Sequence, residues 1–73
     1  MTRKKSKSDQ KLGKKIQGSR KMLGATQEEF AEVINISRTH MGHLEQGRKT
    51  PSLKLLAKIA KALKVKVKDL IPY

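Results

Sequence analysis

Apolar residues recur every three or four positions near the start of the chain, which predicts an amphipathic helix. This helix covers about residues 9–23, with Leu12, Ile16 and Leu23 facing a core. Its outer side carries Lys11, Lys14, Lys15 and Lys21, so this side is expected to be basic. Gly24 follows the last apolar position, where a helix commonly ends.

Two shorter helices joined by a tight turn are predicted over residues 26–47. The Thr26 hydroxyl can accept a backbone N–H that the first helical turn leaves unpaired, and Glu29 completes a capping box. Asn35 tolerates the left-handed conformation that a sharp break between helices needs, and Ser37 can cap the second helix. The expected inward-facing residues are Phe30, Ala31 and Ile34 in the first helix, and Met41, Leu44 and part of Glu45 in the second.

The last third of the chain predicts one more helix and a short tail. The helix covers about residues 52–63, with Ser52 as its cap. Its buried face is expected to hold Leu53, Leu56, Ile59, Ala60 and Leu63. The tail over 65–71 alternates apolar and charged residues, which by itself favours a strand.

The charge balance favours a polyanionic partner. The 73 residues include 18 Lys and Arg against 6 Asp and Glu, for a net charge of +12 and a pI of about 10.4. Nucleic acid is the expected partner, with an anionic membrane surface as the alternative. Residues 1–8 are predicted to form a disordered basic arm ahead of one folded domain over 9–73. Two aromatic residues are too few for a platform that stacks single-stranded bases.

The sequence offers little support for catalysis, metal binding or membrane insertion. It contains no defensible Ser/His/Asp grouping, glycine-rich phosphate loop or acid–base carboxylate pair, so we expect neither an enzyme nor a cofactor. His40 and His43 could share a metal only in a poor site, because no cysteine or carboxylate pair accompanies them. No apolar run approaches the roughly 18 residues that span a bilayer, and the basic N-terminus lacks the apolar segment of a secretory signal. A cytoplasmic, nucleoid-associated protein is expected.

The helix that follows Ser37 has an outward face suited to the DNA major groove. This face is short and polar, and it comprises Arg38, Thr39, Gly42, His43 and Gln46. A helix that presents such a face from a two-helix corner can insert into the groove and reach base edges. Arginine can pair with guanine through two hydrogen bonds, and threonine or histidine can also reach a base edge. We therefore predict base contacts from Ser37, Arg38, Thr39 and His43.

This stretch resembles the helix-turn-helix of the lambda-repressor/Cro-like (XRE) family. The likeness extends over about residues 13–70, and its most specific segments are TQEEFA at 26–31, INIS at 34–37, LEQG at 44–47 and PSL at 51–53. The family often has glycine where Asn35 stands, and it seldom has glycine where Gly42 stands. The resemblance implies a compact all-α domain of five helices, in which helices 2 and 3 form the helix-turn-helix and a short fifth helix covers about 67–71.

The resemblance also implies contacts with DNA phosphates. The expected residues are Thr26, Gln27, Gln46, Arg48 and Lys49, with Lys14 and Lys15 as weaker candidates. The family typically pairs an arginine of the first helix with a glutamate near the end of the third, and Arg20 and Glu45 stand at the matching positions. Such a pair is expected to pin the two helices together and to orient Arg20 towards a phosphate.

These observations predict a sequence-specific, double-stranded DNA-binding transcriptional regulator. It is expected to bind an inverted repeat as a homodimer, with the two recognition helices roughly 34 Å apart. The expected dimer surface is the apolar C-terminal segment, formed by Val65, Val67, Leu70, Ile71 and Tyr73. The alternative is a protein-interaction module, such as an antitoxin or a bridging coactivator, whose basic charge gives only general affinity for DNA. The operator, the direction of regulation and any protein partner stay open.

Overall fold

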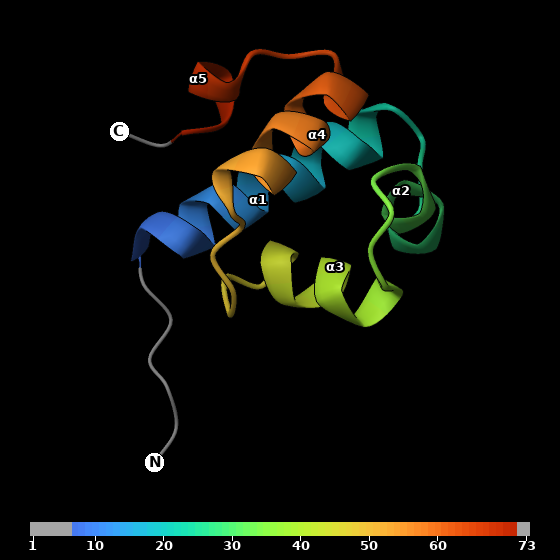
Figure 1. Ribbon diagram of the computed structural model, residues 1–73, viewed down its shortest axis with the longest axis horizontal. Coiled ribbons are helices and arrows are strands. Elements are labelled where there is room, and N and C mark those ends of the chain that lie inside the picture. The colour runs from blue at the N-terminus through green and yellow to red at the C-terminus, as the bar shows by residue number, and fades with distance from the viewer. Residues whose placement is uncertain (1–6, 72–73) are drawn as a thin grey trace.

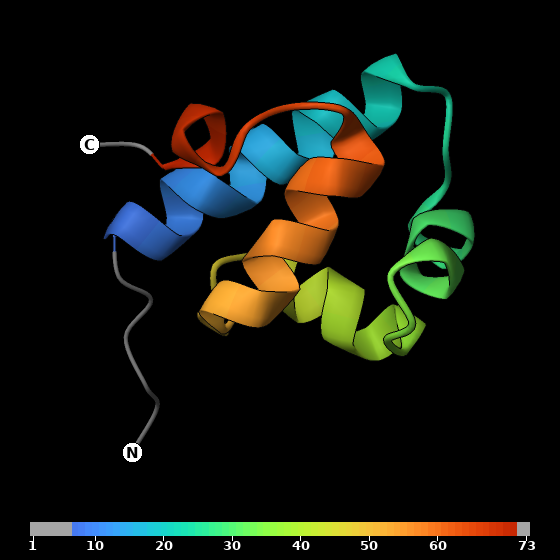
Figure 2. The same ribbon diagram turned by 45° about the horizontal axis from the view of Figure 1, so that its top comes forward.

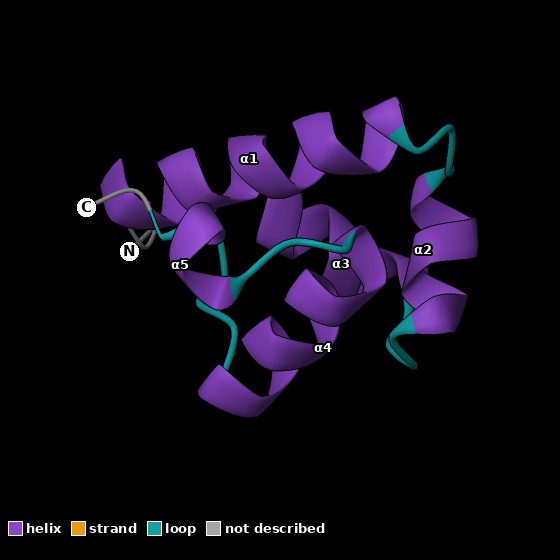
Figure 3. Ribbon diagram, turned by 90° about the horizontal axis from the view of Figure 1, so that it is seen from above, coloured by secondary structure: helices purple, strands orange, loops and turns teal. Residues whose placement is uncertain are grey.

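The computed structural model describes residues 7–71, and this part of the chain has five helices and no strand (Figure 3). The helices are α1 (Lys7–Met22), α2 (Gln27–Val33), α3 (Arg38–Glu45), α4 (Leu53–Leu63) and α5 (Val67–Leu70). The predicted all-helical fold is therefore confirmed. Helix α1 begins at Lys7 rather than at the expected Asp9, and residues 1–6 of the predicted basic arm lie outside the described residues.

The helices pack around one core, with α3 on the rim of the molecule. Helix α3 packs against α1 and α2, and α4 packs against α1 and α5. Figure 1 shows α3 along the lower edge, with α1 and α4 above it. In the turned view of Figure 2, the corner formed by α2 and α3 lies at the opposite end of the molecule from α5. One long side of α3 is thus left without a covering helix in the described part of the chain.

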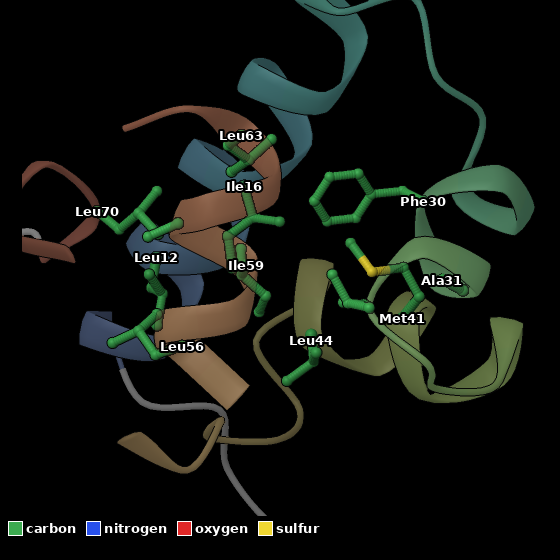
Figure 4. Close-up of a cluster of buried hydrophobic side chains, with 12 residues drawn as sticks. Leu12, Ile16, Phe30, Ala31, Met41, Leu44, Leu56, Ile59, Leu63 and Leu70 are labelled. Atoms are coloured by element: carbon green, nitrogen blue, oxygen red, sulfur yellow. The ribbon is translucent and has the colours of Figure 1, made fainter. Parts of the chain in front are cut away.

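The core is built from one apolar stripe of each helix, as Figure 4 shows. Phe30 and Met41 face each other at the α2–α3 corner, while Ile16 of α1 lies against Ile59 of α4. Ile16, Met41 and Ile59 have no solvent-exposed surface, and each such side chain stabilises the fold by about 1.5–3 kcal/mol relative to an exposed one. The buried apolar residues are Leu12, Ile16, Phe30, Ala31, Ile34, Met41, Leu44, Leu56, Ile59, Ala60, Leu63 and Leu70.

Local hydrogen bonds fix the corner between α2 and α3. Thr26 Oγ1 accepts from the Glu29 N–H at 3.1 Å, and the Glu29 carboxylate accepts from the Thr26 N–H at 2.9 Å. Ser37 Oγ accepts from the His40 N–H at 3.0 Å, which caps α3. Asn35 adopts the left-handed conformation, with φ of 59°. The predicted capping box, turn and second cap are all confirmed.

The backbones of α1 and the end of α3 approach each other without side chains between them. A Cβ atom on Gly13 would lie 2.5 Å from the carbonyl oxygen of Glu45 and 2.6 Å from that of Leu44. Gly47, which ends α3 with φ of 74°, has its missing Cβ position 2.8 Å from Gln10 Cα. Since any larger residue would force the helices apart, these two glycines set how close α3 sits to α1.

A buried ion pair also joins these two helices. Arg20 Nε donates to Glu45 Oε2 at 2.6 Å, and Arg20 Nη2 donates to Glu45 Oε1 at 3.0 Å. Arg20 Nη1 donates to the carbonyl of Ala25 at 2.7 Å, and the side chains of the pair are only 7% and 1% exposed. The hydrogen bonds to Glu45 raise the pKa of Arg20 above its already high ordinary value, while burial opposes the shift and the Glu45 charge adds to it. The expected pairing of Arg20 with Glu45 is confirmed.

Three leucines do not lie where the sequence pattern placed them. Leu23 is 50% exposed rather than in the core, because α1 ends at Met22 and the chain then turns outwards. Leu53 is 76% exposed, because the first turn of α4 borders an unfilled hollow that separates it from the start of α1. Leu70, expected on the dimer surface, is 2% exposed and belongs to the protein's own core.

The C-terminal tail forms the short helix α5 that the resemblance implied, and not the strand that its alternation favours. The Asp69 carboxylate accepts from the Lys66 N–H at 3.0 Å, which closes the first turn of this helix. Lys64 takes a left-handed conformation at the end of α4, so the chain reverses before α5 begins. These local bonds and the burial of Leu70 together outweigh the alternating pattern.

We expect Glu45→Ala to lower the free energy of unfolding by about 3–5 kcal/mol, because it leaves the Arg20 guanidinium buried without its counter-charge. Urea unfolding followed by circular dichroism measures this loss. The double variant Arg20→Met/Glu45→Leu replaces both charges with apolar groups and should recover most of it. A Glu45→Ala variant within about 1 kcal/mol of the wild type, as for an exposed pair, would contradict the buried arrangement.

The capping box predicts a specific pH dependence of stability. The hydrogen bond from the Thr26 N–H lowers the pKa of Glu29 below its ordinary value of 4.5, and the Thr26 hydroxyl adds to this shift. Because the folded state favours the charged carboxylate, this stabilisation is complete above pH 4.5 and is lost as the pH falls through the lower pKa of the folded protein. Thermal unfolding midpoints should therefore fall less on acidification for Glu29→Gln than for the matched variant Glu28→Gln. Equal slopes for the two variants would refute the capping box as the cause.

Candidate nucleic-acid interface

The uncovered side of α3 is polar. Arg38, Thr39 and Gln46 are exposed, and Gly42 and His43 are partly exposed. The opposite side carries Met41, Leu44 and Glu45, all of which are buried. Ser37 ends the preceding turn so that the first residues of α3 stand at the corner of the molecule (Figure 1). The sequence pattern therefore predicted the inward and outward faces of α3 correctly.

A hollow of about 300 Å³ lies between the start of α2 and the outer side of α3. Its lining residues are Gln27, Arg38, Thr39, Gly42, His43, Gln46 and Arg48. The hollow thus brings together residues of α3 that are predicted to contact bases and residues of α2 and of the loop after α3 that are predicted to contact phosphates. Two arginines line the hollow, and no carboxylate is among its described lining residues, so it suits an anionic ligand rich in hydrogen-bond acceptors.

Three further site candidates lie outside this hollow. Ser37 and Thr26 are exposed, and both hydroxyls act as helix caps. Lys49 is exposed in the loop between α3 and α4. Their roles as DNA contacts remain predictions.

Gln27 is tied to the buried ion pair. Its Nε2 donates to Glu45 Oε1 at 3.0 Å, the same oxygen that accepts from Arg20 Nη2. Sequence reasoning gave Gln27 a phosphate contact and missed this bond. The two residues are 18 positions apart, and only the packing of α2 on α3 brings them together.

Two side chains that were predicted to contact phosphates are bonded within the protein instead. The Arg20 guanidinium is buried against Glu45 and Ala25, so it positions α3 and does not reach outwards to a phosphate. Lys15 Nζ donates to the Asp69 carbonyl at 2.7 Å, which draws this side chain towards α5 and away from α3. Lys14 is exposed on α1 and does not line the hollow.

Residues 7–71 contain neither a cluster of metal ligands nor a membrane-spanning helix. No group of three or more His, Cys, Asp or Glu in this range is placed to hold a metal ion. No helix in the same range is long and apolar enough to cross a membrane.

Comparison with known proteins supports the same family as the geometry. Residues 16–70 match the helix-turn-helix family model HTH_3. The uncharacterized HTH-type transcriptional regulator YazB of Bacillus subtilis (strain 168) is 35% identical over 60 residues, which cover 82% of this chain and 87% of YazB.

Two solved structures have a closely similar fold. The clp gene regulator ClgR from Corynebacterium glutamicum superposes with a TM-score of 0.84 and 33% identity, over 92% of this chain and 71% of that chain. SinR, the master regulator for biofilm formation, solved in complex with DNA, has a TM-score of 0.76 and 28% identity, over 81% of this chain and 95% of that chain. With the capped α2–α3 corner and a family match over most of its length, this chain belongs to the lambda-repressor/Cro-like (XRE) helix-turn-helix family.

Proposed function

We propose that the chain is a sequence-specific transcriptional regulator that binds double-stranded DNA with α3 in the major groove. The observation that carries this proposal is the gathering of Arg38, Thr39 and His43 on an uncovered helix face beside Arg48. Base edges in the major groove offer a distinct pattern of donors and acceptors to such a face. The role is one of binding rather than catalysis, exercised on nucleoid DNA in the cytoplasm. YazB's name as a transcriptional regulator and the DNA in the SinR structure support the same role here.

The interface divides into residues that read bases and residues that hold the DNA backbone. Arg38, Thr39 and His43, with Ser37 at the edge, would contact base edges. The phosphate contacts would come from Thr26, Gln46, Arg48 and Lys49, on either side of α3. A net charge of +12 would attract DNA over a long range and make binding salt-dependent.

We propose that the regulator binds an inverted repeat as a homodimer through its C-terminal segment. Leu70 is buried and cannot contribute to this contact, and Tyr73 lies outside the described residues. Ile71 borders an apolar hollow beside the highly exposed Leu53, so we extend the proposed surface to the start of α4. An exposed apolar side chain next to a hollow suits a self-complementary contact across a two-fold axis.

We predict that Arg38→Ala relaxes specificity at one base position and weakens binding to the preferred duplex by about 1–3 kcal/mol. Competition binding against duplexes varied at each position measures the effect. The control Arg48→Ala removes a proposed phosphate contact, so it should weaken all duplexes alike and reduce the salt slope by about one. If Arg38→Ala also weakens every duplex equally, the alternative of a protein-interaction module with general DNA affinity gains support.

The dimer predicts that Leu53→Glu shifts the protein towards the monomer and weakens binding to a full inverted repeat more than to a half-site. Sedimentation at high micromolar concentration, with and without the duplex, measures the assembly. Val33→Glu places the same charge at another apolar position, which is 70% exposed on α2, and should leave assembly unchanged. A wild-type protein that stays monomeric under all these conditions would exclude the homodimer.

A further inference from the structure

Gly42 stands in the middle of α3 without a packing reason to be glycine. Glycine inside a helix costs roughly 1 kcal/mol relative to alanine, so an explanation for its presence is needed. Apart from its chain neighbours and the backbone of its own helix, a Cβ atom built on Gly42 meets no heavy atom nearer than Gln27 Oε1, at 4.0 Å. Gly13 differs in this respect, because a Cβ atom at that position would clash with the backbone of α3. The space beside Gly42 is therefore empty because the side chain is missing, and it forms part of the hollow on the proposed DNA-binding face.

The Gln27 carboxamide faces this space with its oxygen. Its Nε2 donates to the Glu45 carboxylate, which can only accept hydrogen bonds. A flipped amide would set its oxygen against that carboxylate, so the orientation is chemically determined. The buried Arg20 holds Glu45 through two further hydrogen bonds. Gln27 Oε1 is thus a positioned acceptor at the hollow beside Gly42.

We propose that Gly42 and Gln27 form a specificity element, in which the missing side chain admits a base edge and Gln27 Oε1 accepts a hydrogen bond from an exocyclic amino group. This inference rests on the proposed function and gives Gln27 a base contact in place of the predicted phosphate contact. In the major groove, the only base donors are the amino groups at N6 of adenine and N4 of cytosine. Guanine and thymine present acceptors there, which a carbonyl oxygen cannot pair with.

The surroundings of Gln27 Oε1 fit this assignment. Arg38 lines the same hollow and supplies donors for the acceptors that flank an amino group, such as N7 of adenine or the guanine paired with cytosine. Arg20 and Glu45 take no part in contacting the base and act as positioning residues for Gln27. The buried ion pair therefore holds the Gln27 amide, and this amide in turn contacts the base edge.

The first test compares Gly42→Ala with Gly18→Ala. Gly18 is an exposed position on α1 whose Cβ would meet nothing within 4 Å, and it does not line the hollow, so the control makes the same chemical change outside the proposed element. Both variants should fold at least as stably as the wild type, since alanine favours helix. Each protein is used to select duplexes from a random library at about 150 mM salt. We expect Gly42→Ala to lose the preference at one position of the site and to keep the rest, while Gly18→Ala matches the wild type.

The second test removes the amino group from the DNA. At the position that Gly42→Ala no longer reads, purine replaces adenine, or pyrimidin-2-one replaces cytosine. The wild type should lose roughly tenfold in affinity, as expected for an acceptor left unpaired, whereas Gly42→Ala should lose less than twofold. Gln27→Leu, which has no acceptor, should be as insensitive to the analogue as Gly42→Ala.

The outcomes separate this inference from the proposed function. A wild-type protein that enriches no consensus overturns the sequence-specific function and the specificity element together. A clear consensus that Gly42→Ala leaves unchanged overturns the element alone, and so does equal sensitivity of wild type and Gly42→Ala to the amino-free analogue.

Discussion

The buried pair between the Arg20 guanidinium and the Glu45 carboxylate is the constraint on which the interface depends. It links α1 to α3. Further hydrogen bonds join the pair to α2 through Gln27 and to the loop between α1 and α2 through the Ala25 carbonyl. A buried charge is costly unless it is fully paired, so these bonds stabilise the fold as a set. Rotation of α3 about its own axis would break the bonds at Glu45. The direction in which Arg38, Thr39 and His43 face is therefore determined from inside the protein.

Two helical glycines have opposite structural roles in this arrangement. At Gly13 the missing side chain is replaced by the backbone of α3, so the glycine lets two helices touch. At Gly42 no neighbouring atoms fill the position of the missing side chain, so the glycine leaves a space on the surface. The sequence shows only a glycine inside a helix in both cases, and the neighbouring helix distinguishes them.

Sequence reasoning predicted those parts of the fold that local chemistry determines. The caps at Thr26 and Ser37 and the left-handed turn at Asn35 depend on residues within a few positions of each other, and they lie where expected. The pairing of Arg20 with Glu45 followed from the family resemblance and not from spacing. Periodicity gave the wrong environment for Leu23 and Leu53, because it identifies the face of a helix but not whether a neighbour covers that part of the face. The bond between Gln27 and Glu45 lay beyond prediction, since it joins helices whose relative placement the sequence pattern does not specify.

The placement of α3 in the major groove is tested most directly by a methylation interference experiment on a duplex that the protein retains by selection. Dimethyl sulfate methylates guanine N7 in the major groove and adenine N3 in the minor groove, so one reaction probes both grooves. With α3 in the major groove, N7 methylation at guanines within the site is expected to block binding, and N3 methylation is expected to leave binding unchanged. Binding that tolerates N7 methylation throughout the site, or that fails only after minor-groove methylation, would contradict the placement of α3 in the major groove.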